Sequence, residues 1–168
     1  MRSDREYAEY VSARLSRLHR TAYLLCGDGH RADDIVQASL IDLYRQWRRA
    51  SAVENLDAYL HRILVRRYLD ERRRAWSRVV LTSTAPDRPA PPDIGPEERD
   101  AVMAALRALP KGQRAVLVLR YFCDLSVEAT AEALGCSTGN VKSQCARGLA
   151  TLREAMGVLN DANGRPTP

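Results

Sequence analysis

The most informative segment of the chain is SVEATAEALGCSTGNVKSQCARGLATL, residues 126–152. Apolar side chains recur at helical spacing up to Leu134, Gly135 interrupts the pattern, and a second apolar face starts at Val141. A glycine here permits the positive φ of a tight turn, and the small side chain of Ala131 lets two helices approach closely. The stretch therefore predicts a helix, a tight turn and a second helix that share one small core.

The second of these helices carries a polar face that suits a DNA surface. Its members are Ser137, Thr138, Asn140, Lys142, Ser143, Gln144 and Arg147. The two amides and the arginine can make paired hydrogen bonds to base edges, whereas the lysine and the serines suit the phosphate backbone. Such a helix presents its first turns to the DNA groove and its positive N-terminal end to phosphates. The alternative is a packed helical hairpin with an ordinary polar outer face.

The rest of the chain has helical periodicity and no alternating strand pattern, which predicts an all-α fold of two small helical domains. We expect three long helices first, over residues 4–26, 31–48 and 56–76. Two more, over residues 97–109 and 111–122, would supply the apolar platform that a helix-turn-helix needs, giving a four-helix domain.

Each of the three N-terminal helices has one apolar face, which we assign to the core. The residues on these faces are Tyr7, Val11, Leu15, Leu18, Ala22 and Leu25, then Ile35, Val36, Leu40, Leu43, Tyr44 and Trp47, and finally Leu56, Leu60, Ile63, Leu64 and Leu69. Asp33 and Asp34 would lie in the first turn of the second helix, where acidic groups complement the helix dipole. The outer side of the third helix is rich in arginine.

Residues 81–96, LTSTAPDRPAPPDIGP, hold five of the eight prolines and predict a semi-extended linker. The expected domains are residues 1–80 and 97–158, with a disordered tail over 159–168. Residues 1–80 hold 16 basic and 11 acidic side chains, residues 81–100 hold 2 and 5, and residues 101–168 hold 8 and 5. Two basic domains flank an acidic middle, which is typical of two polyanion-binding modules.

The sequence gives no sign of a catalytic or metal centre. The four cysteines form no Cys-x-x-Cys pair, so we expect free thiols, no metal and no cofactor. Because the chain lacks paired carboxylates or a nucleophile with a base partner, we do not expect an enzyme. With no signal peptide and no apolar run of membrane-spanning length, we expect a cytoplasmic protein without membrane contact of its own.

Taken in order, these segments resemble the group IV, extracytoplasmic-function (ECF) sigma factors of bacterial RNA polymerase. ADDIVQASLIDLYRQW (32–47) is similar to region 2.2, and NLDAYLHRILVRRYLDERRR (55–74) is similar to regions 2.3 and 2.4. ALRALPKGQRAVLVLRYFCDLSVEATAEALGCSTGNVKS (105–143) resembles region 4. The resemblance spans about residues 6–156 and is strongest to short actinobacterial members.

The resemblance implies a transcription-initiation subunit that binds core RNA polymerase and promoter DNA and is held inactive by an anti-sigma factor. By match to the family, the polymerase-binding positions are Asp34, Gln37, Leu40, Tyr44 and Trp47. For Tyr44 and Trp47 the alternative is a place in the domain core. The minus-10 DNA-binding positions are Asn55, Tyr59, Arg62, Arg66, Asp70, Arg73 and Arg74. The polar face of the helix-turn-helix would read the minus-35 element.

The chain departs from the family pattern at a few of these positions. Arg66 stands where many members have asparagine, and Gln144 stands where arginine is frequent. The main alternative function is a one-component helix-turn-helix regulator that binds duplex operators as a dimer. The arginine-rich helix over residues 56–76 speaks against that alternative.

Overall fold

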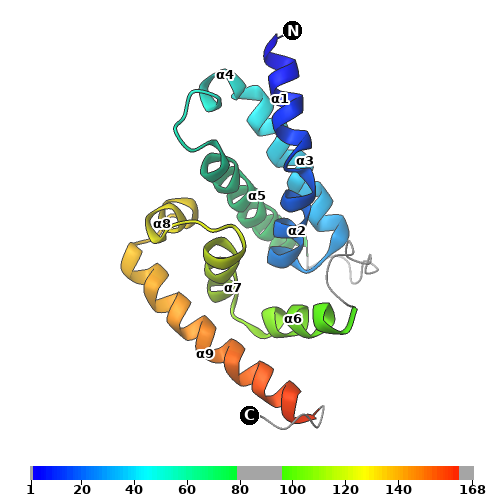
Figure 1. Cartoon of the computed structure of the whole chain (residues 1–168), viewed down its shortest axis with the longest axis vertical. Helices are drawn as coiled ribbons and strands as arrows, with labels where there is room; N and C mark the ends of the chain where they lie inside the picture. Colours follow the sequence, from blue (N-terminus) through cyan, green and yellow to red (C-terminus); the bar gives the residue numbers. More distant parts are fainter. Residues whose placement is uncertain (1, 79–95, 163–168) are drawn as a thin grey trace. The chain divides into compact units, whose positions relative to one another are not determined.

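The computed structural model describes residues 2–78 and 96–162, without the side chains of residues 71–78, 96–99 and 158–162. Within these ranges the chain is helical and has no strand, which confirms the all-α class (Figure 1). It divides into two compact units: α1 to α5 belong to the first, and α6, α7, η1 and α9 belong to the second with the start of α8. The predicted linker lies outside the described residues, except for Pro96, where α6 begins.

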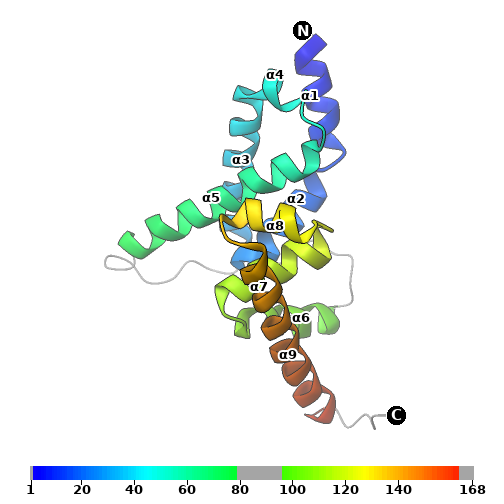
Figure 2. The same ribbon diagram turned by 90° about the vertical axis from the view of Figure 1, so that its left-hand side faces the viewer.

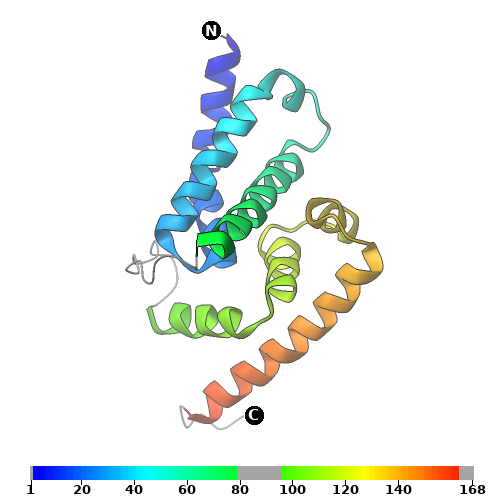
Figure 3. The ribbon, with the colours of Figure 1, turned by 180° about the vertical axis from the view of Figure 1, so that it is seen from behind.

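The core of the N-terminal unit is made by three helices: α2 (Leu15–Cys26), α3 (Gly29–Arg45) and α5 (Leu56–Arg78). Figure 3 shows α3 and α5 side by side. The buried side chains at the centre include Leu18, Leu25, Leu43, Leu60 and Leu64. All five lie on the predicted apolar faces, so helical periodicity located this core correctly.

The first predicted helix, residues 4–26, is wrong as a single element. It is two helices, α1 (Arg2–Ser12) and α2, separated at Ala13 and Arg14. The Arg14 guanidinium lies 3.9 Å from the centre of the Tyr10 ring, and its Nε donates to Asp57 on α5. This contact accompanies the break, and Leu15, predicted to lie in the core, is 39% exposed.

The start and the end of the second helix also differ from the prediction. Asp28 caps α3: its Oδ1 accepts hydrogen bonds from the backbone N–H groups of His30 and Arg31. Asp33 and Asp34 therefore lie beyond the first turn, contrary to the expectation. At the other end α3 stops at Arg45, and the short helix α4 (Trp47–Ala50) follows.

Aromatic side chains attach α1 to the rest of the N-terminal unit. The Tyr7 ring lies edge-on to Tyr44 and Trp47, at centroid distances of 5.1 and 5.3 Å, and the Tyr10 ring lies 5.6 Å from Trp47. The Tyr7 hydroxyl donates to the carbonyl oxygen of Leu40 over 2.8 Å. The helix α1 has no buried residue, so these rings are its main attachment.

The C-terminal unit consists of α6 (Pro96–Ala108), α7 (Lys111–Leu117), the π-helical turn η1 (Val118–Phe122), the start of α8 (Val127–Leu134) and α9 (Thr138–Ala162). The helices α6 and α7 both pack against α9, as Figure 2 lets the reader follow. The predicted helix over residues 111–122 corresponds to α7 followed by η1, so its geometry changes from α to π after Leu117. The helix α9 runs to Ala162, so residues 159–162 are helical rather than part of a disordered tail.

Two glycines of α9 differ in what an added methyl group would meet. At Gly148 it would lie 3.1 Å from Leu117 Cδ1 and 3.4 Å from Gln113 Cβ, whereas nothing lies within 4 Å at Gly157. Leu117 is buried, so it has little room to move away. Gly148 thus allows α7 and α9 to pack closely.

We therefore expect opposite results from the same substitution at these two positions. Gly157→Ala should raise the free energy of unfolding by about 0.5–1 kcal/mol, because alanine favours the helix. Gly148→Ala should lose this gain and destabilise by about 1 kcal/mol, because the methyl group overpacks the α7 interface. Urea denaturation followed by circular dichroism would measure both. Equal stabilisation by the two variants would contradict the close packing at Gly148.

Candidate nucleic-acid interface

The helix-turn-helix formed by α8 and α9 is built as its sequence predicts. Gly135 has φ of +67°, the left-handed conformation that a glycine adopts without strain. Ala131 and Val141 are buried on either side of the turn. The Ser126 hydroxyl accepts from the Ala129 N–H at the start of α8, and the Ser137 hydroxyl accepts from the Asn140 N–H at the start of α9.

Most of the polar face of α9 is exposed. The exposed members are Ser137, Thr138, Asn140, Lys142, Ser143 and Arg147. Gln144 is half-buried, and its amide lies beside Gly112 on α7, where an added Cβ would be 3.9 Å away. The structure therefore leaves six of the seven predicted side chains open and places Gln144 at the edge of the face. Figure 2 shows the first turns of α9 directly after the turn that follows α8.

In the N-terminal unit, the first two predicted minus-10 residues lie where α5 begins: Asn55 ends the loop between α4 and α5, and Tyr59 lies in the first turn of α5. Asn55 caps α5, because its Oδ1 accepts from the Ala58 N–H over 2.9 Å. The Tyr59 hydroxyl donates to Gln46 Oε1 over 2.6 Å. Gln46 is not among the residues predicted from the sequence. Its role depends on a contact with a residue 13 positions away, which helical periodicity does not reveal.

The remaining minus-10 candidates lie along α5. Arg66 is exposed, and Arg62 and Asp70 are half-buried. Arg73 and Arg74 belong to α5, but their side chains lie outside the described residues. Their neighbour Arg67 donates through Nε to Asp42 on α3, an ion pair that is largely shielded from solvent. The contact fixes α5 against α3.

The predicted polymerase-binding residues fall into two groups: four lie on α3, and Trp47 begins α4. Asp34, Gln37 and Tyr44 are exposed, and Leu40 is half-buried. Ile41, next to them, is 52% exposed. Trp47 is only 6% exposed and packs against Tyr7 and Tyr10. The core alternative therefore holds for Trp47, whereas Tyr44 presents an accessible ring.

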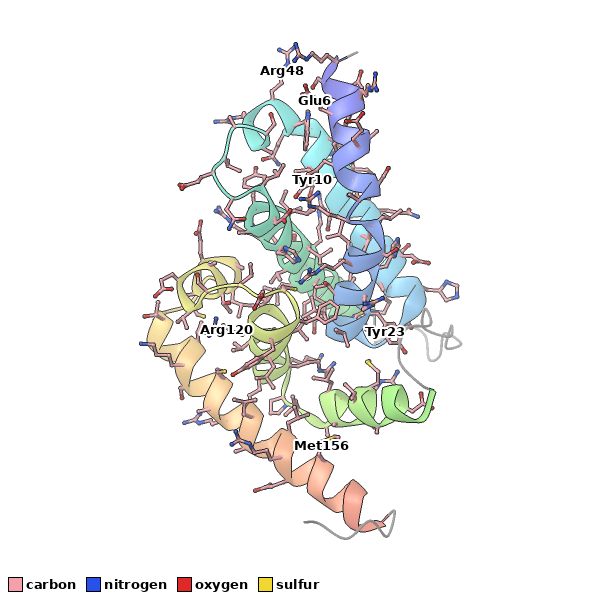
Figure 4. All side chains as sticks on the ribbon, in the orientation of Figure 1. Glu6, Tyr10, Tyr23, Arg48, Arg120 and Met156 are labelled. Atoms are coloured by element: carbon pink, nitrogen blue, oxygen red, sulfur yellow. The ribbon has the colours of Figure 1, made fainter. Side chains whose placement is uncertain are left out.

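A cluster of charged and polar groups joins the α1–α2 break to the first turn of α5. The Tyr10 hydroxyl donates to Asp57 Oδ1 over 2.6 Å, beside the contact from Arg14; Figure 4 labels Tyr10 on α1. Burial raises the pKa of Asp57, but the hydrogen bonds from Arg14 and Tyr10 outweigh it and hold this pKa below its usual range. Burial, and then the bond to Asp57, raise the pKa of the Tyr10 hydroxyl. The carboxylate stays charged and holds the start of α5 in place.

His61 lies one turn further along α5 and is buried. Its Nδ1 donates to the backbone carbonyl of Asp57 over 2.6 Å, and its Nε2 is buried without a hydrogen-bond partner in the described part of the chain. Burial lowers the pKa of this imidazole below 6.5, and the charge of Arg17 acts in the same direction. The folded N-terminal unit therefore favours the neutral form of the His61 imidazole.

This pKa shift predicts a loss of stability in acid. The unfolded chain binds a proton at His61 near pH 6.5, whereas the folded chain binds it only at a lower pH. The contribution of neutral His61 to the free energy of unfolding is therefore complete above pH 6.5. It is lost as the pH falls from 6.5 through the lowered pKa of the folded state. We expect the urea midpoint of the wild-type chain to fall more between pH 7.5 and 5.5 than that of His61→Asn, whose amide can still donate to the Asp57 carbonyl. Identical pH profiles of the two proteins would refute the assignment.

Two other kinds of site are absent from the described part of the chain. Among the residues that the structure describes, no group of three or more His, Cys, Asp or Glu side chains is placed to hold a metal ion. No helix within the same ranges is both long and apolar enough to cross a membrane.

Two family models match the chain: "Sigma-70 region 2" over residues 10–78 and "Sigma-70, region 4" over residues 99–152. The RNA polymerase sigma-E factor of Streptomyces coelicolor is 36% identical over 163 residues, which are 95% of this chain and 90% of that protein. The ECF RNA polymerase sigma factor SigM of Mycobacterium tuberculosis is 36% identical over 147 residues, 86% of this chain and 74% of that protein.

Solved structures show the same fold. The sigma factor RpoE from Bartonella quintana, in complex with the anti-sigma factor NepR, matches with a TM-score of 0.75 at 24% identity, over 91% of this chain and 98% of that one. CnrH, in complex with the cytosolic domain of CnrY, matches with a TM-score of 0.65 at 22% identity, over 92% and 90% of the two chains. With both sigma-70 regions matched in order, and relatives of 36% identity over most of its length, the chain belongs to the ECF sigma factors of the sigma-70 family.

Proposed function

We propose that this protein is a sigma factor that binds core RNA polymerase and directs transcription to promoters with two recognition elements. The observation that carries the proposal is that one chain contains both sigma-70 regions, region 2 before region 4. A duplex-binding regulator needs only the second. The catalytic groups would be those of the polymerase, and the protein would work in the cytoplasm beside it.

Docking on core polymerase is assigned to the outer face of α3. The face combines an acid, an amide and accessible apolar side chains, namely Asp34, Gln37, Leu40, Ile41 and Tyr44. Such a mixture suits a protein partner better than DNA, which attracts basic surfaces. Trp47 would contribute from the core, by holding Tyr7 against Tyr44.

Minus-10 recognition is assigned to the loop before α5 and to α5 itself. Asn55 and Tyr59 offer an amide and an aromatic ring for an unpaired base. Arg62, Arg66, Arg73 and Arg74 would hold phosphates of the melted strand, with Asp70 among them. Because the Asn55 and Tyr59 side chains are each held by a hydrogen bond, they need little ordering when DNA binds.

Minus-35 recognition is assigned to the start of α9. Asn140, Gln144 and Arg147 would contact base edges, while Lys142 and the hydroxyl groups of Ser137, Thr138 and Ser143 would contact phosphates. The support is the exposure of this face and the positive end of a long helix behind it.

Control by an anti-sigma factor is the regulatory part of the proposal. It is supported by the structural relative RpoE, which was solved in complex with the anti-sigma factor NepR. A partner that covered Ile41 and Tyr44 would remove exposed apolar surface from solvent and compete with polymerase for α3. Co-purification of the tagged chain from its own cells should recover an inhibitor as well as polymerase; recovery of polymerase alone would argue against tight inhibition.

The deciding experiment is transcription in vitro with purified core polymerase and a library of promoter fragments. We expect the chain to direct initiation at a set of promoters that share two elements, and core polymerase alone to give none of these transcripts. Failure to direct any initiation, with specific duplex binding intact, would favour the one-component regulator instead.

A further inference from the structure

An acidic side chain occupies the end of α5 that the proposed function assigns to DNA. Asp57 lies in the first turn of α5, between Asn55 and Tyr59 in the sequence, and its side chain is 53% exposed. A carboxylate at this place repels phosphates and offsets the positive end of the helix, which would otherwise attract them. Charge alone therefore makes Asp57 unfavourable for DNA binding.

The carboxylate of Asp57 is held from the break between α1 and α2. The Tyr10 hydroxyl donates to Oδ1 over 2.6 Å, and the Arg14 guanidinium donates to both oxygens, through Nε to Oδ1 and through Nη2 to Oδ2 over 3.5 Å. The same guanidinium lies 3.9 Å from the centre of the Tyr10 ring. An isolated exposed ion pair contributes little to stability, but these hydrogen bonds and the cation over the ring form a network that fixes all three side chains.

The network is anchored in the core at two points. The Tyr10 ring lies 5.6 Å from the ring of Trp47, which is buried. The backbone carbonyl of Asp57 accepts a hydrogen bond from Nδ1 of His61, which is also buried. The first turn of α5 is thus fixed through the side chain of Asp57 and through its backbone.

We propose that Asp57 is a positioning residue for minus-10 DNA binding: together with Tyr10 and Arg14, it holds the first turn of α5 in the orientation in which this helix meets the DNA strand. None of the three side chains is assigned a DNA contact. Because the turn is already ordered, DNA binding does not have to supply the free energy to order it. The break between α1 and α2, which no glycine or proline marks, brings Tyr10 and Arg14 to this carboxylate. The inference rests on the proposed function, which assigns α5 to the minus-10 element.

Charge and positioning predict opposite results for Asp57→Asn. If charge decided the affinity, removal of a carboxylate near phosphates would strengthen DNA binding. Positioning predicts weaker binding instead, because the amide loses the ion pair with Arg14 and offers a single oxygen to the donors. Glu54→Gln is the matched control, since it removes the same charge from an exposed side chain of the preceding loop.

Tyr10→Phe tests the network without any change of charge. The variant removes the hydroxyl group that donates to Asp57 but keeps the ring against Trp47. Ser12→Ala is its control, because the Ser12 hydroxyl donates to the Ala8 carbonyl within α1 itself. If Tyr10 and Asp57 act through one network, the double variant should lose less affinity than the product of the two single losses.

The measurement is binding of a fluorescent single strand to holoenzyme reconstituted with core polymerase; the strand carries the minus-10 sequence of a promoter that the wild type uses. It is made at a temperature at which urea denaturation shows each variant fully folded, so that a loss of stability alone does not lower the affinity. We expect Asp57→Asn and Tyr10→Phe to bind the strand about 2- to 10-fold more weakly, the range of a lost hydrogen bond. Glu54→Gln and Ser12→Ala should stay within about twofold of the wild type. The affinity of all four variants for core polymerase, which α3 is proposed to bind, should match that of the wild type.

The outcomes separate the inference from the function beneath it. A wild-type chain that directs no initiation removes the proposed function, and the inference with it. If initiation is normal but Asp57→Asn binds the strand as tightly as the wild type or more tightly, the inference alone is wrong. Wild-type strand affinity in Tyr10→Phe, or equal losses of strand and polymerase affinity in both variants, would overturn it as well, because the contact would then be merely structural. If Asp57→Asn does not fold, Tyr10→Phe decides the question alone.

Discussion

Replacing Trp47 with alanine is expected to lower the free energy of unfolding of the N-terminal unit by about 3–5 kcal/mol, the usual cost of emptying the site of a large buried aromatic residue. Trp47 is 6% exposed and packs against the rings of Tyr7 and Tyr10 on α1. Without it, α1 loses the ring that both tyrosines contact. Urea denaturation followed by circular dichroism would measure the loss, and hydrogen exchange should rise first in α1.

Two further variants identify the cause of this effect. Trp47→Phe should cost much less, because the ring packing is retained and the indole N–H is buried without a hydrogen-bond partner in the described structure. Ile41→Ala, on the exposed face of α3, should change stability by less than about 0.5 kcal/mol. Trp47→Phe should also keep its affinity for core polymerase, whereas Tyr44→Ala should lose affinity. If Trp47→Phe kept normal stability but lost most of its affinity for core polymerase, Trp47 would belong to the docking surface and not only to the core.

Arg147→Ala is expected to weaken holoenzyme binding to a cognate minus-35 duplex by about 1–3 kcal/mol, roughly 5- to 150-fold, and to relax the base preference at one position. Lys142→Ala should instead weaken binding to all duplexes to a similar degree. It should also reduce the slope of log affinity against log salt concentration by about one, the contribution of one phosphate contact. The difference arises because a guanidinium can pair with a guanine edge through two bonds, whereas an ammonium group acts as a point charge on a phosphate.

The matched control for both is Arg153→Ala, which removes an exposed arginine two turns further along α9. Because only the first turns of a recognition helix reach the bases, Arg153→Ala should keep the sequence preference. Fluorescence anisotropy with cognate and scrambled duplexes at several salt concentrations would separate the three variants. If Arg147→Ala and Lys142→Ala lowered cognate and scrambled binding equally, the assignment of Arg147 to a base edge would be wrong.

The helix-turn-helix could be predicted from sequence because its determinants are local. A positive φ at Gly135 follows from the absence of a side chain, and the burial of Ala131 and Val141 follows from helical spacing on either side of it. The same reasoning placed the apolar faces of α2, α3 and α5. The DNA-contact roles along these helices remain predictions.

The break between α1 and α2 could not be predicted in this way. No glycine or proline marks it, and the contact that accompanies it is made by Asp57, 43 residues further along the chain from Arg14. The cap of α3 was missed for a different reason. Asp28 carries an ordinary capping side chain, but it stands between two glycines, residues that usually interrupt a helix, although Gly29 begins α3.

Sequence alone determined that the chain is helical, that its recognition helix follows a glycine turn, and that two sigma-70 regions lie in order along it, because spacing and residue type fix local conformation. Tertiary structure decided which residues of one apolar stripe face solvent: Tyr44 is open and Trp47 is covered, although both lie on the same stripe. It also brought the Gln46 amide to the Tyr59 hydroxyl, 13 residues further along the chain. These outcomes depend on partners such as Tyr7, Tyr10 and Tyr59, which packing alone brings within reach.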